Sequence, residues 1–190
     1  QLTRGVGMLM RKNNVEVVRG RGSLRDAGTI ELADDGRQLT GENVIIATGA
    51  RQRDIPSLPI DHEVVITSRE ALERREVPDR VVIVGGGATG CEFAHIYRTY
   101  GAEVTIVELL PRLIPTEDEE VSALLERSFA RRGIKLLTGA SVQGISVSGA
   151  SARVSVSADA TDSSIECDTV LVAVGVQGNV DGIGLDRVGV

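Results

Sequence analysis

The sequence predicts an α/β protein in which a parallel sheet is combined with an antiparallel meander. One observation is a β-branched run, Val81–Val84, that leads through three glycines and a helical stretch to a second apolar run ending at Glu108. Another is the change of pattern after a third apolar run at 134–137, where alternating segments are joined by Gly149-Ala150-Ser151. This order of elements predicts a Rossmann-like, three-layer unit.

Glycines follow the first apolar run in the spacing G-x-G-x-x-G. Gly85 suits the tight turn off the strand, Gly87 leaves room for a phosphate to approach the backbone, and Gly90 lets the helix pack closely on the strand. The unpaired N–H groups at the start of the helix then favour an anion. Because strand, helix and terminal acid surround the glycines, the pattern predicts dinucleotide binding; the alternative is a Rossmann-like unit without a ligand.

The acid at the end of the second strand, Glu108, predicts which dinucleotide binds. A carboxylate there can accept hydrogen bonds from both hydroxyls of an adenosine ribose, and it would repel a 2′-phosphate. Glu108 therefore selects NAD over NADP. Arg112 could indicate a 2′-phosphate site, but Glu108 stands first after the strand.

Helix-start signals lie on both sides of the motif. Residues 67–70 (Thr-Ser-Arg-Glu) have the pattern of a capping box and predict a short helix through Glu76. A helix is expected over 88–100. Residues 116–119 (Thr-Glu-Asp-Glu) look like a second capping box that opens an amphipathic helix. Further along, residues 165–174 predict one long buried strand.

The residues before the motif predict a helix and short strands. The periodicity indicates a helix at 2–12 and strands at 15–19, 29–32 and 44–47. The last run is followed by Thr48-Gly49-Ala50, a small-residue turn of the kind by which α/β folds present backbone to a ligand. Gly22 permits close approach to the backbone, although an ordinary turn explains it equally well.

Residues 51–60 contain Pro56 and Pro59 and lack periodicity, so we interpret them as a linker and a domain crossing. We expect a partial first domain at 1–60, a nucleotide-binding domain at 61–180, and the start of a return into the first domain at 181–190. The chain begins without Met inside a helical pattern and ends after a Gly-rich loop, so we expect a piece of a longer protein.

Composition excludes several classes of protein. A net charge of −6 and an aromatic content of 2% argue against nucleic acid as a partner. No apolar run approaches the ~20 residues of a membrane helix, and no secretory signal is visible. Cys91 and Cys167 lack metal-type or C-x-x-C spacing, which predicts reduced, buried thiols in a cytoplasmic protein. His62 and His95 are too isolated for a metal site, so no metal is expected.

Three segments, VIIATGA, VVIVGGGATGCEFAHIYRTYGAEVTIVE and DTVLVAVG, occur in this order. In this the chain resembles the pyridine nucleotide–disulfide oxidoreductases, and within them the dihydrolipoamide dehydrogenase branch. The continuations Gly90-Cys91-Glu92-Phe93 and Tyr-x-x-x-Gly-Ala-Glu-Val-Thr from Tyr97 are the specific details. The resemblance covers essentially the whole chain.

The resemblance implies roles for individual residues in two cofactor sites. It implies that NAD is bound by Gly85, Gly87, Ala88, Thr89, Gly90, Glu92, Glu108, Val142 and Gly175. Among these, Glu92 would lie on the nicotinamide side near a flavin, although a solvated helix carboxylate is the alternative. Val142 would line the adenine end, and Gly175 would pass close to the nicotinamide half. For FAD, the resemblance implies Gly22, Thr48, Gly49 and Ala50 in the neighbouring, incomplete FAD-binding domain.

The resemblance also implies a reaction, in which electrons pass from dihydrolipoyl groups to a cysteine disulfide, then to FAD and then to NAD. The family's redox-active cysteine pair and first FAD motif are absent from these 190 residues, so we assign no catalytic residue and expect the chain alone to be inactive. The whole protein is expected to be a homodimer that can join a 2-oxo acid dehydrogenase complex. After Gly175 many relatives carry Arg-x-Pro-Asn, whereas this chain has Val-Gln-Gly-Asn, which puts the local flavin-side contact in doubt.

Two other readings remain open. The chain could come from another flavoprotein of the same broad family, such as an NADH oxidase, a mercuric reductase or a transhydrogenase. It could also be a non-catalytic nucleotide-binding module. A C-x-x-x-x-C motif upstream would favour lipoamide chemistry, whereas a single cysteine would favour oxidase chemistry.

Overall fold

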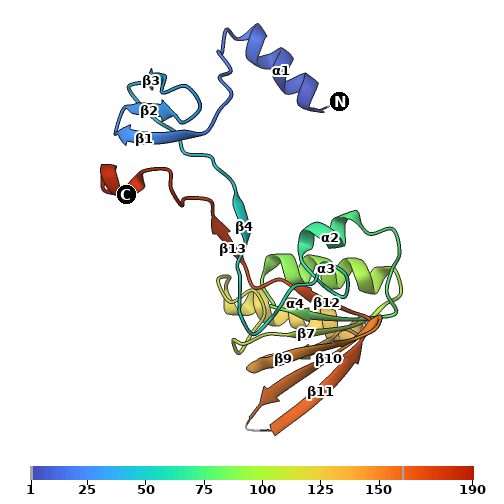
Figure 1. The fold of residues 1–190 in the computed structure, drawn as a ribbon. Helices are drawn as coiled ribbons and strands as arrows, with labels where there is room; N and C mark the ends of the chain where they lie inside the picture. The colour runs from blue at the N-terminus through green and yellow to red at the C-terminus, as the bar shows by residue number, and fades with distance from the viewer. Residues whose placement is uncertain (1, 160) are drawn as a thin grey trace. The chain divides into compact units, whose positions relative to one another are not determined.

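The computed structural model describes residues 2–159 and 161–190 (Figure 1). The chain divides into two compact units. The larger is the continuous stretch Ala50–Gln177, and the smaller combines Gln1–Gly49 with Gly178–Val190. The nucleotide-binding motif lies entirely within the larger unit.

The larger unit is built on a five-stranded sheet in which every pairing is parallel. Its strands, in spatial order, are β5 (Val65–Ile66), β12 (Thr169–Val172), β6 (Arg80–Val84), β7 (Glu103–Val107) and β8 (Lys135–Leu137). The chain moves outward from β6 through β7 to β8, and later returns to place β12 on the other side of β6. This reversal makes the carboxyl end of β6 a topological switch point, where open α/β sheets bind their ligands.

Helices and a meander cover opposite faces of this sheet, as Figure 1 shows. The helices are α2 (Ser68–Glu73), α3 (Ala88–Thr99) and α4 (Glu119–Arg131), and the meander consists of β9 (Ala140–Ser148), β10 (Ser151–Ala158) and β11 (Thr161–Cys167). Val81 and Ile83 of β6 belong to the core cluster of the helices, whereas Val82 and Val84 belong to that of the meander. The predicted three-layer α/β fold is therefore confirmed. Burial on both faces explains why β6 is a continuous β-branched run.

The predicted long strand at 165–174 is wrong. The run forms two strands of different sheets, β11 ending at Cys167 and β12 beginning at Thr169. Asp168 lies at the corner, where its N–H donates to the Arg80 carbonyl (2.9 Å) and its carboxylate pairs with the Arg80 guanidinium (2.7 Å). The polar residue interrupts the apolar run because the chain leaves the antiparallel meander there and enters the parallel sheet.

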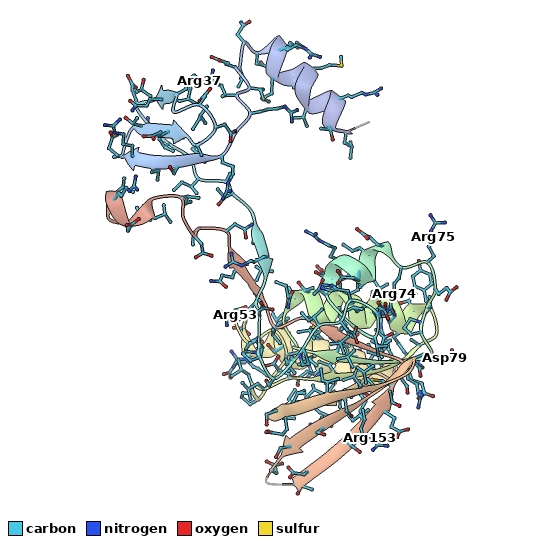
Figure 2. The ribbon with its side chains drawn as sticks, in the orientation of Figure 1. Arg37, Arg53, Arg74, Arg75, Asp79 and Arg153 are labelled. Atoms are coloured by element: carbon cyan, nitrogen blue, oxygen red, sulfur yellow. The ribbon has the colours of Figure 1, made fainter. Side chains whose placement is uncertain are left out.

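One of the two predicted capping boxes is confirmed. Thr67 caps α2, its side chain accepts from the Arg69 N–H, and Glu70 bonds back to the Thr67 N–H. This helix ends at Glu73 rather than Glu76, because Arg74 is already extended (ψ 141°). The Arg74 side chain, labelled in Figure 2, instead donates to the Thr169 hydroxyl at 2.8 Å.

The predicted capping box at residues 116–119 is wrong. The N-cap of α4 is Asp118, whose carboxylate accepts from the Glu120 N–H at 2.8 Å. Asp is at least as good an N-cap as Thr, and its negative charge also suits the positive end of the helix dipole. The helix therefore begins two residues later than the capping-box pattern indicates.

The smaller unit contains α1 (Leu2–Lys12) and an antiparallel sheet of β1 (Gly22–Asp26), β2 (Thr29–Leu32) and β3 (Gln38–Thr40). Its carboxyl-terminal part adds a short 3-10 helix, η1 (Leu185–Val188), which follows a bond from the Leu24 N–H to the Ile183 carbonyl (2.7 Å). β4 (Ala50–Gln52) and β13 (Val176–Gly178) form a two-stranded sheet where the chain enters and leaves the larger unit. None of the helices within 2–159 and 161–190 has the length and apolar character needed to cross a membrane.

Two strands predicted in the smaller unit are wrong. Residues 15–19 and 44–47 adopt no regular structure, and they expose side chains such as Val17 (61%) and Ile45 (89%). A β-branched apolar run becomes a strand only when another strand accepts its backbone hydrogen bonds and covers its side chains. Within the described residues, these two segments have no such neighbour.

Candidate nucleotide-binding site

The glycine turn between β6 and α3 lies at the carboxyl end of β6, at the switch point of the sheet. Gly85 has φ +108°, which L side chains rarely adopt, and its N–H donates to the Val107 carbonyl at 2.8 Å. A Cβ on Gly85 would lie 2.5 Å from the Ala173 carbonyl oxygen just beyond β12. Gly85 is therefore required both by its backbone conformation and by its contact with the neighbouring strand.

The absence of a side chain at Gly90 allows α3 to pack closely against this turn. A Cβ built on Gly90 would lie 1.9 Å from the carbonyl oxygen of Gly85. No side chain can occupy that space unless the helix moves away from the strand. The third glycine of the motif thus has the close-packing role that its spacing predicts.

Gly87 differs from the other glycines of the turn because the protein itself does not require it. Its φ is −73°, which any residue can adopt, and a Cβ there would meet no atom within 4 Å. It is also the N-cap of α3, and no side chain caps that helix start. Ala88 and Thr89, the first two helical residues, are exposed. The turn therefore presents open space in front of the positive end of a helix, which fits a phosphate group.

Gly86 is a residue of this site that the spacing of the motif does not single out. A Cβ there would lie 2.6 Å from Leu113 Cδ2 and 3.1 Å from the Glu108 side chain. The Ile114 N–H donates to the Gly86 carbonyl at 2.8 Å. The signal in the sequence is the pair Leu113-Ile114, two apolar residues inside a loop bracketed by prolines, which indicates burial of that loop.

Glu108, directly after β7, is buried, with an exposed fraction of 8%. One carboxylate oxygen accepts from the Gly86 N–H, and the other accepts from the Leu110 N–H at 2.7 Å. Each oxygen retains a further lone pair for a hydroxyl donor. The structure thus brings Glu108 directly beside the glycine turn, as the strand order requires.

The Arg112 guanidinium is used within the loop that follows Glu108. It donates to the carbonyls of Pro115 (3.0 Å) and Glu117 (3.3 Å) and pairs with the Glu119 carboxylate (2.7 Å). Arg112 therefore holds the loop together through Nη1 and Nη2, whereas its Nε is buried without a hydrogen-bond partner among the described residues.

The other residues assigned to NAD lie on three separate segments of the larger unit. Glu92 is exposed on α3, in the turn that follows Gly90. Gly175 is exposed after β12 with φ +102°, and its carbonyl accepts from the Arg53 N–H at 3.1 Å. Figure 2 shows Arg53 at the opposite side of the sheet from Asp79, which precedes β6, so Gly175 lies on the carboxyl side with the glycine turn. Val142, in β9, pairs with Val156 and packs against the meander core.

Three of the four residues assigned to FAD are consecutive, at 48–50, where the chain passes into the larger unit, whereas Gly22 lies in β1. In the smaller unit, Asn179 joins two of them: its N–H donates to the Gly49 carbonyl (2.9 Å) and its Nδ2 to the Thr48 carbonyl (3.2 Å). Ala50 begins β4 and is exposed. A Cβ on Gly22 would lie 2.8 Å from Ile30 Cγ2, so packing within β1 and β2 already accounts for this glycine.

The two cysteines are buried thiols in different layers. Burial raises the pKa of Cys91 to about 11, helped by the charges of Glu108, Glu126 and Glu92, and burial likewise raises the pKa of Cys167 to about 11. Cys91 belongs to the helix-side core and Cys167 to the meander-side core. They are therefore poor nucleophiles near neutral pH and do not form a dithiol pair. No group of His, Cys, Asp or Glu suited to a metal ion occurs in the part of the chain that the structure describes.

The geometry is that of a dinucleotide-binding turn, and comparison with known proteins identifies the family. A family model described as pyridine nucleotide-disulphide oxidoreductase matches residues 1–190. The chain belongs to this family.

Curated relatives and solved structures agree with this assignment. Dihydrolipoyl dehydrogenase of Mycobacterium leprae is 45% identical over 98% of the chain, and that of Chlorobaculum tepidum is 46% identical over 99% of it. LpdA of Mycobacterium tuberculosis superposes with a TM-score of 0.81 at 32% identity, over 98% of this chain and 42% of that one. A ferredoxin reductase of Rhodopseudomonas palustris reaches 0.75 at 27% identity, over 95% of this chain and 46% of that one.

The match extends over only part of these relatives. The chain spans 41% of the length of both dihydrolipoyl dehydrogenases. What this oxidoreductase-family chain does as part of a whole enzyme is therefore a matter for proposal.

Proposed function

We propose that this chain is the NAD-binding portion of a flavin-dependent disulfide oxidoreductase of the dihydrolipoyl dehydrogenase type. The observation that carries the proposal is the contrast within the glycine turn. Protein atoms crowd Gly85, Gly86 and Gly90, whereas the space at Gly87 is open and faces the start of an uncapped helix. A dinucleotide pyrophosphate explains why this position also lacks a side chain.

In this proposal the residues of the turn bind and orient the nucleotide. The amides at Gly87, Ala88 and Thr89 hold the pyrophosphate, and Glu108 accepts from the hydroxyls of the adenosine ribose. Val142 lines the adenine end, while Gly175 passes near the nicotinamide half. Glu92 lies two residues beyond Gly90 on α3 and faces the nicotinamide side. When bound, the nicotinamide supplies hydride transfer, and the protein contributes its position and surroundings.

The disulfide chemistry of the whole enzyme belongs to residues other than Cys91 and Cys167. Both thiols are buried, both have a raised pKa, and they lie on opposite faces of the sheet. The 190 residues alone therefore should not reduce NAD with dihydrolipoamide. Measurable lipoamide-dependent NADH formation by the isolated chain would contradict this.

FAD is the second cofactor of the proposal, with Thr48, Gly49 and Ala50 contributing backbone to its site. Asn179, which bonds to Thr48 and Gly49, would hold this small-residue turn in shape. The packing of Gly22 on Ile30 already explains why this position is a glycine. The whole protein would act as a homodimer and could join a 2-oxo acid dehydrogenase complex.

Dihydrolipoyl groups are the proposed electron donor. The relatives named dihydrolipoyl dehydrogenase favour dihydrolipoyl groups, but a similar fold occurs in a ferredoxin reductase. A non-catalytic nucleotide-binding module is the alternative from another class. The flanking coding sequence separates these readings: a C-x-x-x-x-C motif upstream supports disulfide chemistry, and its absence would remove that support.

Nucleotide titration tests the proposal on the chain itself. Isothermal titration calorimetry with NAD and with NADP should give saturable binding, and NAD should bind at least about tenfold more tightly, a difference of about 1.4 kcal/mol. Tighter binding of NADP would contradict the role of Glu108. Absence of binding to either nucleotide would contradict the function as a whole.

A further inference from the structure

The loop between β7 and α4 supports the glycine turn through contacts with Gly86. The Ile114 N–H donates to the Gly86 carbonyl (2.8 Å), and the Glu108 carboxylate accepts from the Gly86 N–H. Leu113, with no exposed surface, fills the space beneath the Gly86 α-carbon. Both polar groups of Gly86 and one side of its backbone are therefore in contact with residues of β7 and this loop.

The turn needs such support because Gly85, Gly86 and Gly87 are consecutive. Glycine has the widest backbone freedom of any residue, so a run of three loses the most conformational entropy when it is ordered. When a binding site becomes ordered only as the ligand binds, the entropy lost on ordering weakens the binding. A preformed site avoids this loss. External contacts that order the run in advance therefore favour nucleotide binding.

The supporting loop is itself attached to α4 by two side chains of that helix. The Ser122 hydroxyl donates to the Ile114 carbonyl at 3.4 Å, and the shorter bond comes from Glu126, in the middle of the helix. The half-buried Glu126 accepts from the Leu113 N–H at 2.9 Å through Oε1. The Arg112 contacts stay within the loop and the first turn of α4, so they do not replace this link. The charges of Glu108 and Glu126 both act on the Cys91 thiol, which contacts the Gly86 carbonyl at 3.4 Å.

We propose that Glu126 is a positioning residue for nucleotide binding, acting through Leu113 on the Gly86 backbone. This inference rests on the proposed function. Glu126 touches no part of the open face at Gly87; it holds Leu113 in place, and Leu113 with Ile114 holds the peptide groups that precede α3. Without the carboxylate, the partly buried Leu113 N–H loses its acceptor and the loop can move away from the turn.

The test compares three substitutions in the full 190-residue chain. Glu126→Leu removes the acceptor, Glu126→Gln keeps a carbonyl oxygen at the same reach, and Glu126→Asp keeps the charge but shortens the side chain. The matched control is Arg98→Leu, which breaks bonds to the carbonyls of Arg132 (2.7 Å) and Ala102 (3.1 Å) at the far end of α3. The Kd for NAD and the thermal midpoint are measured for each.

We expect Glu126→Leu to raise the Kd for NAD about three- to tenfold, because the Leu113 N–H loses the acceptor that holds the loop against the turn. Glu126→Asp should show a similar rise, and Glu126→Gln should stay within about twofold of the unsubstituted chain. Arg98→Leu should lower the thermal midpoint without changing the Kd. If Glu126→Leu does not fold, the Asp and Gln variants carry the comparison.

Several results would overturn the proposal. An unchanged Kd in the Leu and Asp variants would remove the positioning role. A rise in Kd for Arg98→Leu in proportion to its lost stability would reduce the effect to general destabilisation. A Gln variant as weak as the Leu variant would assign the effect to charge instead of hydrogen bonding. Failure of the unsubstituted chain to bind NAD would instead refute the proposed function, and this inference with it.

Discussion

Gly87 and Gly90 belong to one motif but are glycines for different reasons. A Cβ on Gly90 would lie 1.9 Å from the Gly85 carbonyl oxygen, whereas one on Gly87 would meet nothing within 4 Å. Contacts within the protein require a glycine at position 90. No contact among the described residues explains the glycine at position 87, and in the proposed function a ligand occupies the space there. Substitution can separate these reasons, because one should change stability and the other affinity.

We therefore expect opposite effects from two matched Gly→Ala variants. Gly87→Ala should lower stability by no more than about 1 kcal/mol, the usual difference between N-cap residues, and raise the Kd for NAD about tenfold or more. Gly90→Ala should lower stability by about 1–3 kcal/mol or more through overpacking. Chemical denaturation and calorimetric titration measure the two quantities. Normal NAD affinity in Gly87→Ala would show that the open face is not the phosphate site.

Glu108 was assigned from sequence as an acid at the end of a strand, and the structure adds a second task. Its carboxylate accepts from the Gly86 and Leu110 amides, so it shapes the turn as well as facing a ribose in the proposed complex. The spacing of the motif predicted that such an acid exists. Only the pairing of β6 with β7 determined that the acid lies against the second glycine.

At the level of elements, the start of α4 shows how a local signal can be misplaced. Residues 116–119 match a capping-box pattern, yet Asp118 is the N-cap. Both residues are acceptable caps, and the sequence of four polar residues does not distinguish them. The contacts of the preceding loop decide, because Arg112 binds the Pro115 and Glu117 carbonyls and keeps those residues outside the helix.

Substitution of the two candidate caps should reveal the difference. Asp118→Ala removes the acceptor of the Glu120 N–H (2.8 Å) and should cost about 0.5–2 kcal/mol. Thr116→Ala, two residues earlier and exposed, should change the free energy of unfolding by less than about 0.5 kcal/mol. Urea denaturation of both variants makes the comparison. Equal losses in the two would contradict the assignment of the N-cap.

The capping box of α2 contributes stability that depends on pH. Burial acts to raise the pKa of Glu70, but hydrogen bonds from the Thr67 hydroxyl and amide outweigh it and lower the pKa from 4.5 to about 2. A carboxylate with a depressed pKa stabilises the fold fully above the unfolded value, and this stability is lost as the pH falls through the folded value. The loss from Glu70 should therefore occur between about pH 4.5 and pH 2.

Glu70→Gln should remove this part of the acid sensitivity, because the amide does not titrate. The difference in thermal midpoint between the original chain and Glu70→Gln should shrink as the pH is lowered from 5 to about 2. Glu73→Gln is the matched control, since Glu73 lies on the same helix outside the capping box. A constant difference across this range would contradict a depressed Glu70 pKa.

At the scale of the whole molecule, buried apolar residues are distributed unequally between the two units. Both core clusters lie in the larger unit, and of the buried apolar residues only Leu24 and Leu32 belong to the described part of the smaller unit. Burial of apolar surface is the main stabilising contribution to folding. The smaller unit should therefore open far more readily than the larger one.

Limited proteolysis should expose this difference. Trypsin is expected to cut first at exposed arginines of the smaller unit, such as Arg19, at the end of the irregular segment 15–19, and Arg21, just after it. A fragment close to residues 50–177 should persist after those cuts, and NAD should slow its further digestion. Arg153, in β10, is an internal control, because it is exposed but lies within a strand paired on both sides. Early cleavage at Arg153 would contradict the predicted order.

The nucleotide-binding half of the fold could be predicted because its signals are local. The β-branched run at 81–84, the spacing of Gly85, Gly87 and Gly90, and the acid at Glu108 each follow from the strand, turn or helix in which they lie. The strands predicted at 15–19 and 44–47 are wrong for a related reason. Their sequences favour extended backbone, but a strand also requires a neighbour, and propensity alone does not provide one.

The sequence by itself determined the α/β class, the family and the position of the nucleotide-binding turn. The tertiary structure decided what surrounds that turn: Leu113 beneath Gly86, Glu126 behind Leu113, and the break at Asp168 that sends β12 to the far side of β6. These features join segments between 13 and 88 residues apart. Periodicity and capping signals act over a few residues, whereas contacts at such separations depend on how the layers pack.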